Sequence, residues 1–332
     1  MKIVSLHKGS NTPKYKQIIT SIEESILNGT LKKGDKLPSL NSIKQKHSLS
    51  RDTVIMAFNE LKSRGIIYSV VGKGYYVSTE DIKVKQKIFL LFDELNSFKE
   101  DLYNSFLKNL SDNIQVDIFF HHFNNTIFHK LINDNLGDYS RYIIMPANFK
   151  NTNLVIQNLP KDKVYILDQI HDDLLEYPAI YQDFEKALYN NLTKVFYLIK
   201  NYKKLVLVFS DDKQPKEMKD GFTKFSSDKN ISFEIINSLE NKTLEKGELY
   251  IIPEDKNLLR IIKKMKSEGL SLKKDIGIIS YNETLLKEIV EGGITTISTD
   301  FKMMGKRLAE MILNKEELKI ENPNNIIIRN SL

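Results

Sequence analysis

The chain has 332 residues, of which 41% are hydrophobic and 28% charged, so it is long enough for two or three ordinary globular domains. It contains no cysteine, which excludes disulfides and cysteine-based zinc sites, and its apolar runs are far shorter than the ~18 residues of a membrane span. The net charge of +6 is uneven: residues 1–80 hold 13 Lys/Arg and 6 Asp/Glu, whereas the remainder is nearly neutral. We therefore expect a cytoplasmic protein, away from membranes, with a basic head that binds a polyanion.

The first 65 residues predict three helices. One face of the first helix is formed by Tyr15, Ile18, Ile19, Ile22 and Ile26, at helical spacing. Thr12 and Pro13 supply its N-cap and first-turn proline, and Asn28-Gly29 its end. Pro38-Ser39 opens a second, short helix. Ser50 caps the third, whose inner face is formed by Val54, Ala57, Phe58 and Leu61.

Residues 66–77 alternate as two strands around the turn VGKG (71–74), which predicts a β-hairpin. Three helices and a hairpin form a winged helix-turn-helix, whose third helix enters the major groove with its first residues at the bases. Arg51 can donate two parallel hydrogen bonds to a guanine or contact a phosphate, and Ser50 and Thr53 suit phosphate contacts. Lys73 lies between two glycines at the hairpin tip, where the backbone can approach DNA closely.

Residues 15–77 resemble the DNA-binding domain of the GntR family of bacterial transcription regulators. The matching runs are 29–39 (GTLKKGDKLPS), 50–54 (SRDTV), 61–65 (LKSRG) and 72–77 (GKGYYV). The predicted DNA-binding residues are Ser39, Asn41, Ser50, Arg51, Asp52, Thr53, Lys73 and Gly74. Asn41 stands where the family usually has arginine, and Ile55 replaces a frequent basic residue, so we expect an operator that differs from the commoner one.

Residues 79–87 are charged and lack a core pattern, which predicts a linker between a DNA-binding head at 1–78 and a body at 88–332. In the body, apolar strands alternate with helical stretches, as in parallel sheets covered by helices. Strands are predicted at 87–93, 115–123, 142–146, 164–169, 205–210, 231–236, 248–253, 276–281 and 294–299, and helices at 100–110, 126–134, 155–159 and 184–198. These strands exceed one compact sheet of usual size, so we expect an α/β body of two lobes.

The body also carries a resemblance. Residues 275–283 and 294–309 are similar to the last third of the effector domains of LacI-type repressors, which are built like periplasmic sugar-binding proteins. Residues 89–98 fit the first strand and loop of those domains, and residues 180–183 fit their first crossing between lobes. The resemblance implies two Rossmann-like lobes of the periplasmic-binding-protein type I kind, which bind a small-molecule effector and form a homodimer.

Ligands of open α/β sheets sit at the carboxyl ends of the strands. That rule selects Asp93, Phe98, Pro146, Asp168, Gln169, Asp211, Glu254, Asp255, Tyr281 and Asn282 as ligand-binding residues. Carboxylates, amides and aromatic faces suit a polyhydroxyl ligand, and the LacI-like pattern makes Asp255 a sugar-binding acid. The arginine that those proteins carry before a Gly-Phe pair is absent, however, and many of the selected residues also suit helix N-caps.

No P-loop, nucleophile elbow or zinc-protease motif occurs, and the histidines are dispersed, so we expect neither an enzyme nor a bound cofactor or metal. The sequence predicts a DNA-binding transcriptional repressor that acts as a homodimer on an inverted repeat and responds to a sugar or sugar phosphate bound between the lobes. A second interpretation is an α/β sugar-binding or sugar-modifying protein whose N-terminal module serves protein contacts. Salt-dependent DNA binding by the head would distinguish the two.

Overall fold

The computed structural model describes residues 3–6, 12–84 and 86–332. Its backbone contacts divide the chain into two compact units. The first unit comprises Met1–Phe92, Leu110–Ile144 and Thr152–Tyr165, and the second comprises Asp93–Asn109, Met145–Asn151 and Ile166–Leu332. The predicted ligand-binding residues from Asp93 to Asn282 all belong to the second unit.

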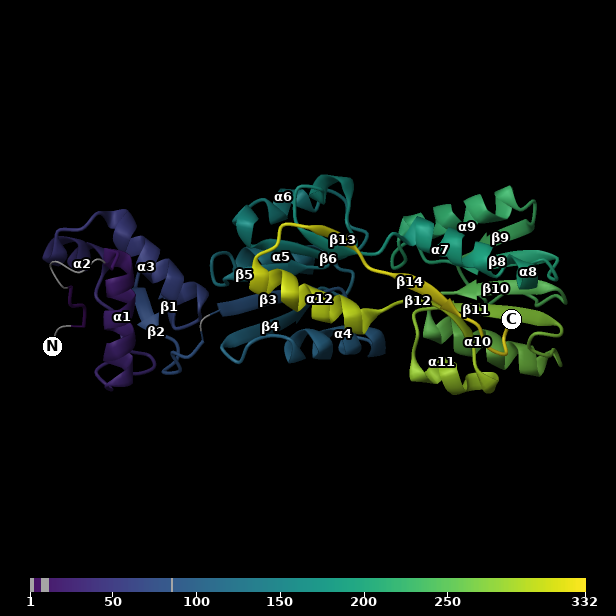
Figure 1. Ribbon diagram of the computed structural model, residues 1–332, viewed down its shortest axis with the longest axis horizontal. Helices are drawn as coiled ribbons and strands as arrows, with labels where there is room; N and C mark the ends of the chain where they lie inside the picture. Colours follow the sequence, from purple (N-terminus) through teal and green to yellow (C-terminus); the bar gives the residue numbers. More distant parts are fainter. Residues whose placement is uncertain (1–2, 7–11, 85) are drawn as a thin grey trace. The chain divides into compact units, whose positions relative to one another are not determined.

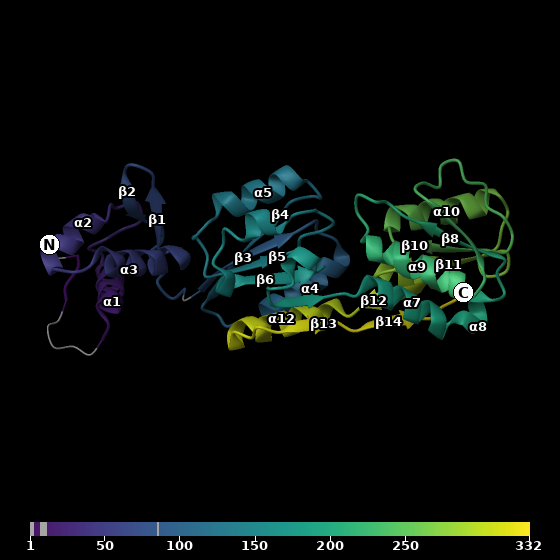
Figure 2. The same ribbon diagram turned by 90° about the horizontal axis from the view of Figure 1, so that it is seen from above.

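The N-terminal head contains the three predicted helices and the predicted hairpin (Figures 1 and 2). They are α1 (Lys14–Leu27), α2 (Leu40–His47), α3 (Arg51–Ser63), β1 (Ile67–Val70) and β2 (Gly74–Val77). The predicted inner face of α3 is confirmed, because Val54, Ala57, Phe58 and Leu61 are all fully buried. The predicted cap of α1 is wrong: the N-cap is Pro13, which offers no side-chain hydrogen bond, rather than Thr12.

Arg64, just after α3, holds the following segment against the head. Its side chain is buried, and its Nη2 lies 2.6 Å from Oε1 of Glu23 on α1. Its Nε donates to the carbonyl of Val84 at 2.9 Å, and Nη2 also reaches the carbonyl of Ile82 at 3.3 Å. Part of the predicted linker is therefore fixed to the head, and the next strand already begins at Gln86.

One of the two large sheets has the order β13-β7-β6-β5-β3-β4. Its strands are β3 (Gln86–Phe92), β4 (Ile114–Phe120), β5 (Arg141–Ile144), β6 (Val164–Asp168), β7 (Ala179–Tyr181) and β13 (Lys319–Glu321). Strand β3 pairs in parallel with β4 and β5, and β7 pairs in parallel with β6 and β13. The helices between these strands are α4 (Ser97–Lys108), α5 (Asn125–Asp134), α6 (Asn153–Ile156), η1 (Lys161–Lys163) and η2 (Asp172–Leu174).

The other large sheet has the order β14-β12-β11-β10-β8-β9, and only its edge strand β14 is antiparallel. Its strands are β8 (Lys204–Val208), β9 (Ser232–Ile236), β10 (Glu248–Ile252), β11 (Ile276–Tyr281), β12 (Thr295–Thr299) and β14 (Asn324–Ile327). Its helices are α7 (Phe184–Lys194), α8 (Phe196–Ile199), α9 (Lys216–Asp228), α10 (Asp255–Ser267), α11 (Leu285–Ile289) and η3 (Val290–Gly292). Helices α7 and α9 cover one face and α10 the other, as Figures 1 and 2 both show.

Two sheets confirm the predicted two α/β lobes, and the chain passes between them three times. The first passage runs from β7 into α7 and β8, the second from β12 through α12 (Phe301–Asn314) to β13, and the third from β13 directly to β14. Helix α12 packs closely on α4, because Gly305 brings its backbone to the carbonyl of Leu102, where a Cβ would collide. The second unit is thus held together by segments distant in sequence.

Candidate nucleic-acid interface and ligand site

The start of α3 carries half of the predicted DNA-binding residues. The Ser50 hydroxyl accepts a hydrogen bond from the backbone N–H of Thr53 at 3.1 Å, which confirms Ser50 as the N-cap, and it lies 2.8 Å from the Thr53 hydroxyl. Arg51 and Asp52, the first two residues of the helix, are exposed. Arg51 takes part in none of the salt bridges among the described residues, so its guanidinium is available to a guanine or a phosphate.

Helix α2 and the hairpin supply the other predicted contacts. Ser39 caps α2 by accepting from the backbone N–H of Ser42 at 3.1 Å, and Asn41 is exposed on its first turn. At the hairpin tip Lys73 is exposed, and Gly74 has a φ of 114°, which a residue with a side chain rarely adopts. Two capped helix starts and a basic tip therefore present backbone N–H groups and positive charge at the surface.

Among the predicted ligand residues, Asp93 and Phe98 flank the start of α4. A buried lysine that the sequence did not identify, Lys99, forms a buried ion pair with Asp93 through its Nζ. The Phe98 ring lies 4.8 Å, centroid to centroid, from the ring of Phe301 on α12. The carboxyl end of β3 thus carries a buried charge pair beside an aromatic surface.

Asp168 and Gln169, at the end of β6, are both buried. Gln182 donates through Nε2 to Oδ1 of Asp168 at 2.6 Å, whereas its own Oε1 is buried without a hydrogen-bond partner. Burial raises the pKa of the Asp168 carboxyl, which nearby Asp93 raises further and Lys99 opposes. An unpaired amide oxygen beside this carboxyl is a position for a ligand hydroxyl donor.

The loops after β5 and β8 meet through a side chain. Pro146 is buried, and the Nδ2 of Asn148, two residues later, donates to the carbonyl of Gln214 at 2.5 Å. The same Nδ2 lies 3.5 Å from the carbonyl of Asp211, whose side chain is exposed. Asp211 is therefore placed beside the loop of Pro146, although its carboxylate extends toward solvent.

Three of the last four predicted ligand residues contact a second buried lysine. Lys287 on α11 is fully buried, and its Nζ lies 2.8 Å from Oδ1 of Asp255, the first residue of α10. The same Nζ donates to the carbonyls of Tyr281 and Asn282 at 2.6 and 2.7 Å. Glu254 is the N-cap residue of α10, although it provides no side-chain cap.

Tyr281 and Asn282 end β11 in different ways. The Tyr281 ring belongs to the hydrophobic core, and its hydroxyl accepts from Asn324 at 3.2 Å. Asn282 adopts a left-handed backbone with φ of 62°, and its Oδ1 is buried without a hydrogen-bond partner. Among the predicted ligand residues, Asn282 thus has a buried amide oxygen that lacks a hydrogen-bond donor. The amide oxygen of Gln182 lacks a donor in the same way, although the strand-end rule did not select Gln182.

Among the described residues, no group of three His, Asp or Glu side chains is arranged to hold a metal ion. Nor does any helix in that part of the chain combine the length and the apolar character that a membrane crossing needs.

Residues 14–77 match the family model "Bacterial regulatory proteins, gntR family". Over 100 residues the chain is 34% identical to the HTH-type transcriptional repressor YtrA of Bacillus subtilis, an alignment that covers 30% of this chain and 73% of YtrA. The chain belongs to the gntR family. This membership confirms the winged helix-turn-helix of the head.

Other relatives match less than a third of this gntR-family chain. The regulator YcxD of B. subtilis is 39% identical over 72 residues, or 22% of this chain and 16% of YcxD. The mannosyl-D-glycerate system repressor MngR of Escherichia coli is 39% identical over 90 residues, or 27% of this chain and 35% of MngR. The chain thus spans only a minor part of YcxD and MngR.

The body has its own structural relatives. A LacI family transcriptional regulator from Silicibacter pomeroyi superposes with a TM-score of 0.63 at 14% identity, covering 74% of this chain and 98% of that protein. The dimeric Lac repressor superposes with a TM-score of 0.62, also at 14% identity, over 74% of this chain and 98% of the repressor. The gntR head is therefore joined to a LacI-like body, and the predicted fold is confirmed.

Asp168→Asn is expected to stabilise the protein at pH 7 by an amount that vanishes in acid. The pKa of the Asp168 carboxyl is higher in the folded state than its ordinary value of 3.8, because burial disfavours the charged form. The folded state therefore loses stability as the pH rises from 3.8 through the folded pKa. The asparagine variant lacks this loss, and its Oδ1 can still accept from Gln182. Urea unfolding between pH 4 and 7 measures the difference, with the exposed Asp212→Asn as control. Lower stability of Asp168→Asn at pH 7 would show that attraction to Lys99 outweighs burial.

Proposed function

We propose that this gntR-family protein is a transcriptional repressor whose binding to an operator is controlled by a small polyhydroxyl ligand. In this proposal the head binds DNA, and the body binds the ligand at the carboxyl ends of its strands, between the lobes. Two chains associate through their bodies and place their heads on the halves of an inverted repeat. The regulators named among the relatives support a role in binding rather than catalysis.

The start of α3 carries the DNA part of the proposal. A capped helix whose first residue is an exposed arginine, with no carboxylate paired to it among the described residues, suits a base edge in the major groove. The exposed Lys73 at the hairpin tip adds a phosphate or minor-groove contact. The charge balance agrees, because the head holds the excess positive charge of the chain.

The ligand part rests on the buried polar groups of the body. The unpaired amide oxygens of Gln182 and Asn282 both require donors, and sugar hydroxyls are donors. The Asp93–Lys99 pair and Asp168 lie at strand ends where a hydroxyl or phosphate group could exchange for their present contacts. The relatives that are named for sugar metabolism, such as MngR, match less than a third of this chain and therefore suggest probes rather than a ligand.

The direct test is binding of the full chain to DNA from the region upstream of its own gene, at several salt concentrations. We expect specific binding whose logarithm falls linearly with the logarithm of salt concentration, and a change in affinity on adding the correct sugar or sugar phosphate. A thermal-shift screen of monosaccharides and their phosphates selects that ligand. Absence of DNA binding at low salt, or binding that ignores salt, would contradict the proposal and favour a head that serves protein contacts.

A further inference from the structure

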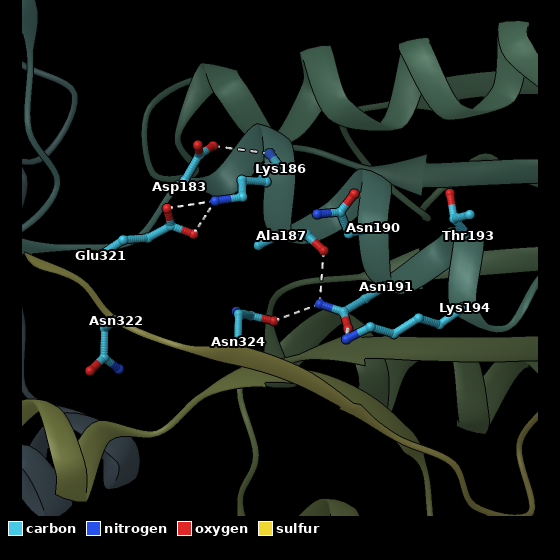
Figure 3. A pocket seen from close by; sticks show the side chains of 10 residues that line it. All are labelled: Asp183, Lys186, Ala187, Asn190, Asn191, Thr193, Lys194, Glu321, Asn322 and Asn324. Atoms are coloured by element: carbon cyan, nitrogen blue, oxygen red, sulfur yellow. Dashed lines mark hydrogen bonds and ion pairs between the residues drawn. The ribbon is translucent and has the colours of Figure 1, made fainter.

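A polar pocket lies between α7 and the segment that joins β13 to β14 (Figure 3). Its volume is about 330 Å³, at the lower end of the range for small-molecule sites. Of the ten side chains that line it, only that of Ala187 is apolar. A pocket of this size and lining suits a small, strongly polar ligand, unlike the larger partly apolar sites that most organic ligands use.

Two lysines and two carboxylates line the pocket, and only one of the lysines forms an ion pair. Glu321 accepts two hydrogen bonds from Lys186 Nζ, at 2.9 and 2.7 Å, and Oδ1 of Asp183 accepts from the backbone N–H of Lys186. Lys194 Nζ, by contrast, contacts the neutral Oδ1 of Asn191 at 3.2 Å. Lys194 is exposed and takes part in none of the salt bridges of the described residues, so its ammonium is available to an anion in the pocket.

Asn190 supplies a second donor in the lining of the pocket. It precedes Lys194 by four residues on α7, and Figure 3 shows the Lys194 ammonium turned toward Asn191 rather than toward the Asn190 amide. Asn190 is exposed, and its amide takes part in no side-chain hydrogen bond among the described residues. The lining therefore offers an ammonium and an amide N–H₂ as donors from α7.

The wall of the pocket joins the passages of the chain between its two sheets. Asn322, which is 4% exposed, donates through Nδ2 to the hydroxyl of Thr299 at 2.6 Å and to the carbonyl of Asp300 at 3.0 Å. Its backbone N–H donates to the carbonyl of Tyr181 at 2.7 Å. These contacts connect the end of β7, the end of β12 and the β13–β14 segment, which are the three passages.

Hydrogen bonds also lead from the pocket toward the ligand residues. Asn191 donates to Oδ1 of Asn324 at 2.9 Å, and Asn324 donates to the hydroxyl of Tyr281 at 3.2 Å. Burial raises the pKa of the Tyr281 hydroxyl, and the charge of nearby Asp168 raises this pKa further. A change in the pocket can therefore reach the end of β11 through two carboxamides.

We propose that this pocket is a second ligand site, which binds a small anion through phosphate or carboxylate oxygens against Lys194 and Asn190, and that the bound anion stiffens the passages between the sheets. The site differs from the polyhydroxyl site proposed above. Its occupancy does not depend on DNA binding, so either proposal can fail while the other stands.

Anion binding is tested by titrating the full chain with inorganic phosphate and, separately, with succinate, by calorimetry at constant ionic strength. We expect binding of at least one of the two, weakened about tenfold or more in Lys194→Ala and unchanged in Lys200→Ala. Lys200 is exposed just after α8, outside the pocket, and its removal changes the net charge equally. Binding of phosphate alone, or of succinate alone, identifies the oxygen chemistry.

Phosphate stabilises most proteins by exclusion from their surface, so a thermal shift in the wild-type protein is no evidence of a site. The decisive result is the difference between variants. Absence of binding, or equal binding by Lys194→Ala and Lys200→Ala, would overturn the site. Hydrogen exchange then tests the second part: with the anion bound, amides of residues 321–324 and of α7 should gain protection in the wild type but not in Lys194→Ala. Protection confined to other segments would overturn the effect on the passages.

Discussion

Arg51→Ala is expected to weaken binding to the specific operator by about 1–3 kcal/mol, or about 5- to 150-fold in dissociation constant. The guanidinium stands exposed on the first residue of α3, beside the Ser50 cap, and is free of salt bridges to the described residues. Alanine removes a bidentate donor while leaving the buried face of the helix unchanged. The thermal stability of the variant should therefore stay near that of the wild type.

Competition with random DNA identifies what Arg51 contacts. If it pairs with a guanine, the loss is confined to the operator. If it contacts a phosphate, operator and random DNA lose affinity equally, and the slope of log K against log salt decreases by about one. Arg260→Ala, an exposed arginine on α10, controls for the lost charge. Unchanged affinity for both DNAs in Arg51→Ala would remove this residue from the interface.

The head could be predicted closely from sequence because its signals are local. Ser50 lies three residues before the N–H that it caps, and the core residues of α3 follow one helical face. The long strands of the body were found for a similar reason, since buried parallel strands are continuous apolar runs. By contrast, the predicted helix at 184–198 is two helices separated at Val195, a residue whose β-branched side chain gives no clear signal of a break.

Three strands were missed because their signal is not local. β7 and β13 contain only three residues each; β13 pairs with β7, with Lys319 opposite Ala179, and β7 also pairs with β6. β14 pairs antiparallel with β12, across the whole of α12 and β13. Short segments carry too few residues to show alternation, so their structure depends on partners distant in sequence.

The predicted ligand residues also show which features a sequence rule can find and which it misses. The strand-end rule selected Asp93, Asp168 and Asn282, because it follows from the topology of parallel sheets. It missed the lysines that partner them, since a lysine in a polar helix start is usually solvated. Gln182 could have been found: it lies in the stretch 180–183 that resembles a crossing between lobes, where a buried amide next to the ligand residues would be expected.

The free energy of unfolding should fall by about 2–4 kcal/mol in Lys287→Met, the largest loss of stability that we expect. Methionine fills nearly the same volume but cannot donate, so the carbonyls of Tyr281 and Asn282 lose their shared partner. Each unsatisfied buried group costs about 1–3 kcal/mol. Asp255 adds less, because 42% of its side chain is exposed and water can replace the ammonium.

The cost of burying the Lys287 ammonium partly offsets the loss of stability in Lys287→Met. It lowers the pKa of the Lys287 ammonium, which means that the folded protein holds this charge at a cost that methionine removes. The net loss should therefore stay below the sum of the three broken contacts. Urea unfolding at pH 7 measures it, with Lys256→Met, an exposed lysine on α10, as the matched control. Because Lys287 holds Asn282 through its carbonyl, Lys287→Met should also lose the thermal shift that the effector causes. Equal stability and equal ligand shifts in Lys287→Met and Lys256→Met would show that the buried ammonium does not position Asn282.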